Sequence, residues 1–200
     1  VWGCGPVGQF AIASAFMLGA ERVVAIDRFE YRLELARSKF GAETLNYEDV
    51  DVHMALRELT GGRGPDHCID AVGLEAHSHT PMYAYDRVKQ AFLLETDRPI
   101  ALRQAIMACR SGGTVAVLGV YGGFVDKFPM GTVLNRCPTI KAAQAPVQRY
   151  MRPLLERIQN REIDPRCVIT HAMKLDDAPH GYKIFNDKLD ECEKIVLKPN

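Results

Sequence analysis

Apolar positions along this chain alternate between a helical spacing and short runs that are apolar throughout. After Gly8, apolar side chains recur every three or four residues as far as Leu18, which predicts a helix packed against a sheet. The apolar run 22–27 that follows is typical of a strand buried on both faces of a parallel sheet. By the same criteria we expect helices at 29–40, 52–59, 102–109 and 147–158, and strands at 43–46, 67–72, 114–118 and 139–142. This alternation predicts an α/β domain with a doubly wound parallel sheet.

Two regions depart from the alternation. Residues 74–98 are polar and longer than the usual connection of about 2–6 residues, so we expect an insertion there with at most one short helix, at 86–94. Residues 166–171 and 193–197 are expected to be strands separated by a helix over 177–188, and not another βαβ repeat. We therefore expect a first domain at 1–165 and a tail, 166–200, that belongs to a second domain.

The strongest motif lies at the start of the chain, where Gly3, Gly5 and Gly8 have the Gly-x-Gly-x-x-Gly spacing of a dinucleotide-binding turn. In such a turn the pyrophosphate lies at the N-terminus of the following helix, because unpaired N–H groups and the helix dipole favour an anion. Only Val1 and Trp2 precede the turn, whereas a strand usually has about 5–6 residues. We therefore expect that the sequence is truncated and that most of the second domain precedes Val1.

Asp27 ends the second expected strand, where an acid would bind the hydroxyl groups of the adenosine ribose. It could instead cap the next turn. A carboxylate at this position favours NAD over NADP because it repels a 2′-phosphate, although Arg28 could offer that phosphate a partner. Arg32, one turn along the next helix, either reaches the ribose or is a solvated helix residue.

Two further segments carry candidate chemistry. The glycine loop 119–123 follows the fifth strand, where its backbone could bind the carboxamide of a nicotinamide or form only a mobile loop. His77 and His79, with Glu75 nearby, suggest a metal, but two histidines without a third ligand at defined spacing do not make a site.

Composition narrows the possible partners. Lys plus Arg and Asp plus Glu both number 25, so bulk charge predicts no nucleic-acid partner. The most apolar stretch, 10–20, is too short to span a bilayer, and no segment resembles a signal peptide, so we expect a cytoplasmic protein. The six cysteines are scattered without zinc-ligand spacing and are expected to be reduced thiols.

Taken together, these residues resemble the zinc-dependent medium-chain alcohol dehydrogenases. The resemblance rests on the glycine turn, on Asp27 with Arg32, and on the segments 70–73 and 118–120. The segments 144–151 and 176–182, together with the insertion, are similar to the branch that contains glutathione-independent formaldehyde dehydrogenases.

This resemblance implies hydride transfer between an alcohol or aldehyde and NAD in an intact homodimer or homotetramer. It implies that the tail belongs to a truncated GroES-like catalytic domain, whose zinc ligands and proton relay all precede the glycine turn. No catalytic or metal-binding residue is therefore assigned in this chain, which is expected to bind NAD without turning over alcohol. The insertion would fold over the cofactor and slow its release. The implied cofactor-binding residues are Gly3, Gly5, Pro6, Val7, Gly8, Asp27, Arg32, Ala71, Val72, Gly73, Leu118, Gly119, Val120, Gln144, Ala145 and Pro146.

Two other functions remain open at this point. The chain could be a non-catalytic module that binds NAD. It could also be an S-adenosylmethionine-dependent methyltransferase, whose glycine turn and strand-end acid look similar, although the glycine loop after strand five and the sixth strand fit that class poorly.

Overall fold

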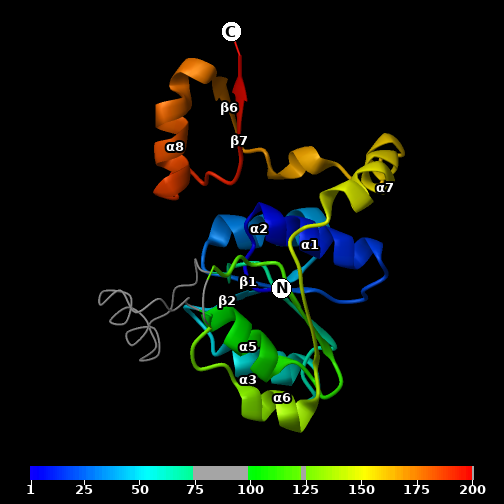
Figure 1. The fold of residues 1–200 in the computed structure, drawn as a ribbon. Coiled ribbons are helices and arrows are strands. Elements are labelled where there is room, and N and C mark those ends of the chain that lie inside the picture. Colours follow the sequence, from blue (N-terminus) through cyan, green and yellow to red (C-terminus); the bar gives the residue numbers. More distant parts are fainter. Residues whose placement is uncertain (74–98, 123–124, 200) are drawn as a thin grey trace.

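Helices and strands alternate along the chain much as the apolar pattern predicts (Figure 1). The computed structural model describes residues 1–73, 99–122 and 125–199. The helices are α1 (Pro6–Met17), α2 (Glu30–Phe40), α3 (Val52–Leu59), α5 (Ile100–Ala108), α6 (Met130–Arg136), α7 (Val147–Gln159) and α8 (Ala178–Asn186). The strands are β1 (Val24–Asp27), β2 (Glu43–Asn46), β3 (His67–Asp70), β4 (Thr114–Val117), β5 (Thr139–Ala142), β6 (His171–Lys174) and β7 (Ile195–Lys198). The expected insertion at 74–98, with Glu75, His77 and His79, lies outside the described residues.

Trp2 joins the two halves of the main parallel sheet. β1 pairs with β2, and β4 pairs with both β3 and β5, in every case parallel. Between these two groups, Trp2 forms parallel bridges to Ile26 of β1 and to Asp70 of β3. The resulting order is β2-β1-Trp2-β3-β4-β5, which is that of a doubly wound dinucleotide-binding sheet. The predicted α/β class and parallel sheet are confirmed.

Helices cover both faces of this sheet (Figure 1). On one face, Ala25 of β1 packs in a buried cluster with Ile12 of α1 and Leu33 of α2. On the other face, Ile26 packs with residues of α3 and α5, Leu56 and Ile106 among them. Successive side chains of a strand point to opposite faces, so burial on both sides explains why residues 23–26 are all apolar.

Local capping marks the start of α3 and the end of α2. α3 begins after Asp51, whose side-chain oxygen Oδ1 accepts a hydrogen bond from the Met54 N–H at 3.0 Å. α2 ends at Gly41, which has a φ of 73°, a left-handed conformation that costs glycine little. The end of α2 and the start of α3 therefore bound the segment in which β2 lies, as the sequence predicts.

The prediction of a strand at 166–171 is wrong. The segment Pro165–Val168 forms a short 3-10 helix, because the Asp164 side chain accepts a hydrogen bond from the Arg166 N–H at 3.0 Å and caps the turn. The strand β6 begins later, at His171. Helix α6 was not expected from the sequence, and none of its residues is buried.

The tail is itself a βαβ unit, contrary to the expectation. β6 and β7 pair in parallel as a separate two-stranded sheet, and α8 connects them. Gly181 allows α8 to pack closely on this sheet, because a Cβ there would lie 2.9 Å from the Met173 sulfur. In Figure 1 the unit, coloured orange to red, lies beyond α1 and α2 and away from the main sheet.

The amphipathic helix expected at 147–158 is present as α7, yet its apolar side is not covered. Val147, Met151 and Leu155 are 55%, 60% and 53% exposed, and none of the thirteen residues of α7 is buried. No helix within the described ranges is long and apolar enough to cross a bilayer.

Candidate functional site

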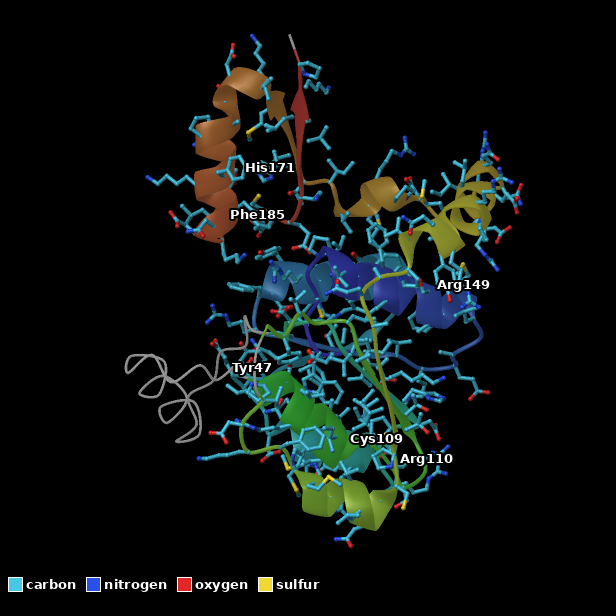
Figure 2. All side chains as sticks on the ribbon, viewed as in Figure 1. Tyr47, Cys109, Arg110, Arg149, His171 and Phe185 are labelled. Carbon is cyan, nitrogen blue, oxygen red and sulfur yellow. The ribbon has the colours of Figure 1, made fainter. Side chains whose placement is uncertain are left out.

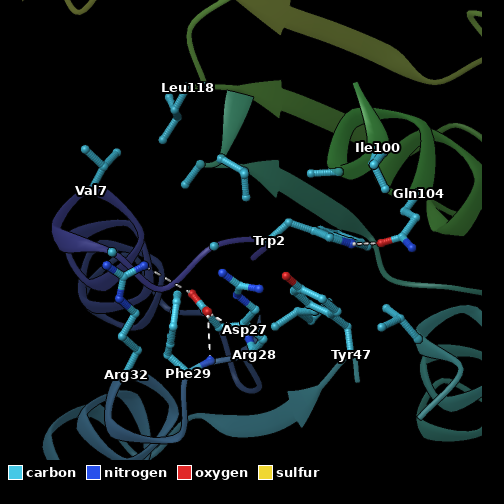
Figure 3. A pocket seen from close by; sticks show the side chains of 18 of the residues that line it. Trp2, Val7, Asp27, Arg28, Phe29, Arg32, Tyr47, Ile100, Gln104 and Leu118 are labelled. Atoms are coloured by element: carbon cyan, nitrogen blue, oxygen red, sulfur yellow. Dashed lines mark hydrogen bonds and ion pairs between the residues drawn. The ribbon is translucent and has the colours of Figure 1, made fainter. Parts of the chain in front are cut away.

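A pocket of about 770 Å³ lies at the carboxyl ends of the central strands (Figure 3). In the sheet, β1 and β2 lie on one side of Trp2, and β3, β4 and β5 lie on the other. The strand order therefore reverses at Trp2. Ligands of open α/β sheets bind at such switch points. The predicted cofactor-binding residues that line this pocket are Gly3, Gly5, Pro6, Val7, Asp27, Arg32, Ala71, Val72, Leu118, Gly119 and Val120.

The remaining predicted residues do not line the pocket. Gly8 is buried in the first turn of α1, and Gly73 lies behind the loop that follows β4. Gln144, Ala145 and Pro146 follow β5 and are exposed at the edge of the sheet. They lie at the same carboxyl edge as the pocket, because β5 runs parallel to β4.

The glycine turn has the close backbone contacts that its motif predicts. Gly3 has a φ of 85°, and a Cβ there would lie 2.7 Å from Cγ2 of Val72. A Cβ on Gly8 would lie 1.9 Å from the carbonyl oxygen of Gly3. The N-cap of α1, Gly5, provides no side-chain hydrogen bond, so no side chain caps the first N–H groups of the helix. Such a helix end is suited to an anion.

Asp27 binds the backbone around it with both carboxylate oxygens. Oδ2 accepts a hydrogen bond from the Cys4 N–H at 2.7 Å, and Oδ1 accepts from the N–H groups of Arg28 (2.7 Å) and Phe29 (3.1 Å). The residue is only 6% exposed but still lines the pocket. Asp27 therefore caps the turn that follows β1, and its carboxylate still lies at the pocket wall.

Arg32 is not a solvated helix residue. Its side chain is 12% exposed, its Nη1 lies 3.8 Å from Oδ2 of Asp27, and its Nε lies 2.9 Å from Oε2 of Glu193. The guanidinium also lies over the ring of Phe29, 5.0 Å from the ring centroid. Burial raises the pKa of the Glu193 carboxyl to about 7, an effect that Asp27 reinforces and Arg32 opposes.

The loops after β3 and β4 meet at the pocket. Asp70 holds the first loop, because its Oδ1 accepts hydrogen bonds from the N–H groups of Val72 (2.9 Å) and Gly73 (3.2 Å). The Tyr121 hydroxyl donates to its Oδ2 at 2.6 Å from the second loop. A Cβ on Gly119 would lie 2.2 Å from the Gly73 nitrogen, so the two loops touch through their backbones.

Sequence reasoning missed several residues of the pocket. Trp2 lines it, and the indole N–H donates to Oε1 of Gln104 at 3.1 Å. Phe185 and Lys188 line it from the end of α8, which faces the main sheet and its helices (Figure 2). Trp2 adjoins the motif and could have been inferred from that position. Phe185 and Lys188 could not, because only the tertiary arrangement brings the tail to the glycine turn.

The chain carries cysteines but no metal centre in the residues that the structure describes. Within those ranges, no group of three or more His, Cys, Asp or Glu side chains could hold a metal ion. All six cysteines are free, and Cys68 and Cys109 are buried.

Comparison with known proteins shows which family this chain resembles. Residues 6–84 match the family described as zinc-binding dehydrogenase. The chain is 40% identical over its full length to the uncharacterized zinc-type alcohol dehydrogenase-like protein AdhB of Bacillus subtilis, of which it covers 52%. It is 31% identical to the glutathione-independent formaldehyde dehydrogenase of the same organism, over 99% of this chain and 48% of the relative.

Solved structures show the same resemblance. The alcohol dehydrogenase TADH from Thermus sp. ATN1 superposes with a TM-score of 0.80 and 29% identity, over 100% of this chain and 50% of the other. The chain thus spans about half the length of the relatives that it matches. Over that half, the chain is similar to zinc-type alcohol dehydrogenases, and the match to the zinc-binding dehydrogenase family covers residues 6–84.

Proposed function

We propose that this chain binds NAD in the pocket at Trp2 and is the cofactor-binding part of a zinc-dependent alcohol or aldehyde dehydrogenase. The observation that carries the proposal is the convergence of the glycine turn, Asp27 and the loops after β3 and β4 on one pocket at the switch point of the sheet. Its volume of about 770 Å³ is within the range of about 300–1,000 Å³ that is usual for ligand pockets.

The residues present fit a dinucleotide. The uncapped N-terminus of α1 and the backbone of Gly3 and Gly5 provide N–H donors and close approach for a pyrophosphate. Asp27 has a carboxylate at the pocket wall that can accept hydrogen bonds from ribose hydroxyls. Val72 and Val120 offer apolar contacts from the two touching loops.

The chemistry of the intact protein is part of the proposal. NAD, when bound, supplies the hydride acceptor, and this chain's residues fix its position and exclude water from one side. Zinc would be held by residues outside Val1–Asn200 and would supply a Lewis acid. The segments 118–120 and 144–146 would frame the nicotinamide, and residues 166–200 would complete the catalytic domain.

A formaldehyde-type substrate is a finer proposal. It is supported by the similarity of segments 144–151 and 176–182 to the formaldehyde dehydrogenase branch, and by the 31% identity to a glutathione-independent formaldehyde dehydrogenase. Assembly into a homodimer or homotetramer remains a prediction. The dehydrogenase relatives favour this reaction over the methyltransferase alternative.

The test uses the single tryptophan of the chain. Trp2 is 4% exposed and lines the pocket, so NADH bound there should quench its emission and accept its energy. Titration with NADH and, separately, with S-adenosylmethionine distinguishes the candidates. Saturable quenching by NADH alone supports the proposal. Tighter binding of S-adenosylmethionine, or no binding of NADH, would contradict it.

A further inference from the structure

Glu193 is a buried charged residue that the fold and the proposed cofactor contacts leave unexplained. It lies just before β7 in the tail and is 1% exposed. Its Oε2 lies 2.9 Å from Nε of Arg32, and its Oε1 lies 4.0 Å from the position that a Cβ on Gly5 would take. Neither oxygen has a well-directed hydrogen bond within the described part of the chain. The tail thus brings a carboxylate to the glycine turn.

Arg32 is held between two acids. Asp27 lies 3.8 Å from its Nη1 and Glu193 2.9 Å from its Nε, and the rings of Phe29 and Tyr31 lie 5.0 and 5.6 Å from its guanidinium carbon. When both acids are ionised, two negative charges surround one positive charge, and the group carries a net charge of −1. A guanidinium held in this way has little attraction left for a further anion.

We propose, on the basis of the proposed dinucleotide site, that Glu193 is a specificity-determining residue. It holds Arg32 and adds a second negative charge beside the adenosine ribose. The pocket therefore rejects the 2′-phosphate of NADP. Without Glu193, Asp27 and Arg32 would form a pair with no net charge. Arg32 could then turn towards that phosphate without meeting a net negative charge. With Glu193 present, the phosphate meets a net negative charge.

The other cations of the pocket do not remove this effect. Arg28 lies 3.8 Å from Glu48, and its guanidinium lies over the ring of Phe29 at 4.6 Å. The ammonium of Lys188 lies 4.6 Å from the ring centroid of Phe185 and acts on Glu193 only through space. Because the pKa of Glu193 is raised to about 7, the charge is present at pH 8, and the test is made there.

The test compares dissociation constants of NAD and NADP for the 200-residue chain and its variants at pH 8. Glu193→Gln removes the charge at nearly constant shape. We expect the ratio Kd(NADP)/Kd(NAD) to fall on the order of tenfold, mainly through tighter NADP binding. The matched control is Glu191→Gln, an exposed acid in the same loop, which should change the ratio by less than about twofold.

A second arm shows whether Glu193 acts through Arg32. In an Arg32→Gln background, Glu193→Gln should lose the part of its effect on the ratio that comes from freeing Arg32. Glu193→Leu provides a second variant without the charge if the glutamine is poorly tolerated. An unchanged ratio in folded Glu193 variants, or an equal effect without Arg32, overturns the inference while NAD binding stands. Failure of the unmodified chain to bind either dinucleotide overturns the proposed function, and the inference with it.

Discussion

Oδ2 of Asp27 accepts a hydrogen bond from the backbone N–H of Cys4 at 2.7 Å, so the acid that ends β1 also holds the glycine turn. Because Oδ1 accepts from the N–H groups of Arg28 and Phe29, the side chain fixes the walls of the pocket on two sides. The residue expected to recognise a ligand is therefore also part of what shapes the site.

Asp27→Asn should reduce both stability and NAD affinity. The amide nitrogen of asparagine cannot accept a hydrogen bond, so either the Cys4 N–H or the N–H groups of Arg28 and Phe29 lose their acceptor, at a cost of about 1–3 kcal/mol. Urea denaturation and NADH titration measure the two effects. Asp49→Asn, an exposed acid in the loop after β2, should change neither. Full stability in Asp27→Asn would contradict a structural role for this carboxylate.

Gly8→Ala should destabilise the fold strongly, because its Cβ would lie 1.9 Å from a backbone oxygen and neither α1 nor the turn can move easily. We expect a loss of about 3 kcal/mol in the free energy of unfolding. Gly131→Ala in α6 is the matched control, since no atom outside the immediate chain lies within 4 Å of its Cβ. It should change stability by less than about 1 kcal/mol. Equal denaturation midpoints for the two variants would rule out the close packing of Gly8.

Glu193 should make stability fall as pH rises from about 4.5 to about 7. Its pKa is raised from 4.5 to about 7, so the folded protein holds the proton more tightly than the unfolded chain does. The resulting stabilisation is complete below the unfolded pKa and is lost as pH rises through the folded pKa, a change of at most about 3 kcal/mol. Asp27, Arg32 and Lys188 act on its carboxyl, and it acts in turn on Tyr31, Cys4 and Cys192.

Denaturation of the wild type and Glu193→Gln at several pH values tests this prediction. The variant should have a flatter profile between pH 5 and pH 8 and should gain stability relative to the wild type at the upper end. Parallel profiles would mean that Glu193 does not bind its proton more tightly in the folded state. Glu191→Gln, which is exposed, should follow the wild type.

Thiol reagents should distinguish Cys137 from the other cysteines. Cys137 is exposed, whereas Cys4, Cys68, Cys109 and Cys192 are buried, and burial raises the pKa of the Cys4 thiol. A hydrogen bond to Cys109, together with burial, also raises the pKa of Cys68. One thiol should therefore react rapidly in the native protein and all six in denaturant.

Cys137→Ser should remove the rapid phase. Cys167→Ser is the comparison, because Cys167 is half-buried and should contribute only a slow phase. Rapid loss of two or more thiols from the native protein would show that the buried set is accessible.

Much of the main domain could be predicted because apolar residues mark its helices and strands. β2, α3 and β5 have the bounds that the apolar pattern indicates, and Gly41 and Asp51 mark two of the ends. The tail was harder, because Asp164 caps a turn where the apolar residues alone suggest a strand. Apolar periodicity does not detect a side chain that caps the backbone.

The site was predictable where a motif determines the backbone, as at Gly3, Gly8 and Asp27. Glu193 was not, because the sequence places it only at the start of an expected strand. Its neighbours Arg32 and Gly5 are distant along the chain, and the contact depends on how the tail unit packs on α2. The residues implied at 144–146 share the sheet edge but not the pocket.

The two halves of the main sheet are joined by hydrogen bonds along a narrow seam. Val1, Trp2 and Gly3 form that seam. On the β3 side, Trp2 N–H donates to the Ile69 carbonyl and Ala71 N–H donates to the Trp2 carbonyl. On the β1 side, Gly3 N–H donates to the Ile26 carbonyl and Ile26 N–H donates to the Val1 carbonyl, and each of the four bonds is 2.8 or 2.9 Å long. The pocket lies across its end, with walls from both halves. A ligand that contacts both walls would therefore oppose separation of the two halves. The amide protons of Ile26 and Ala71 should exchange more slowly when it is bound. The bound cofactor would thus stabilise the sheet that forms its own binding site.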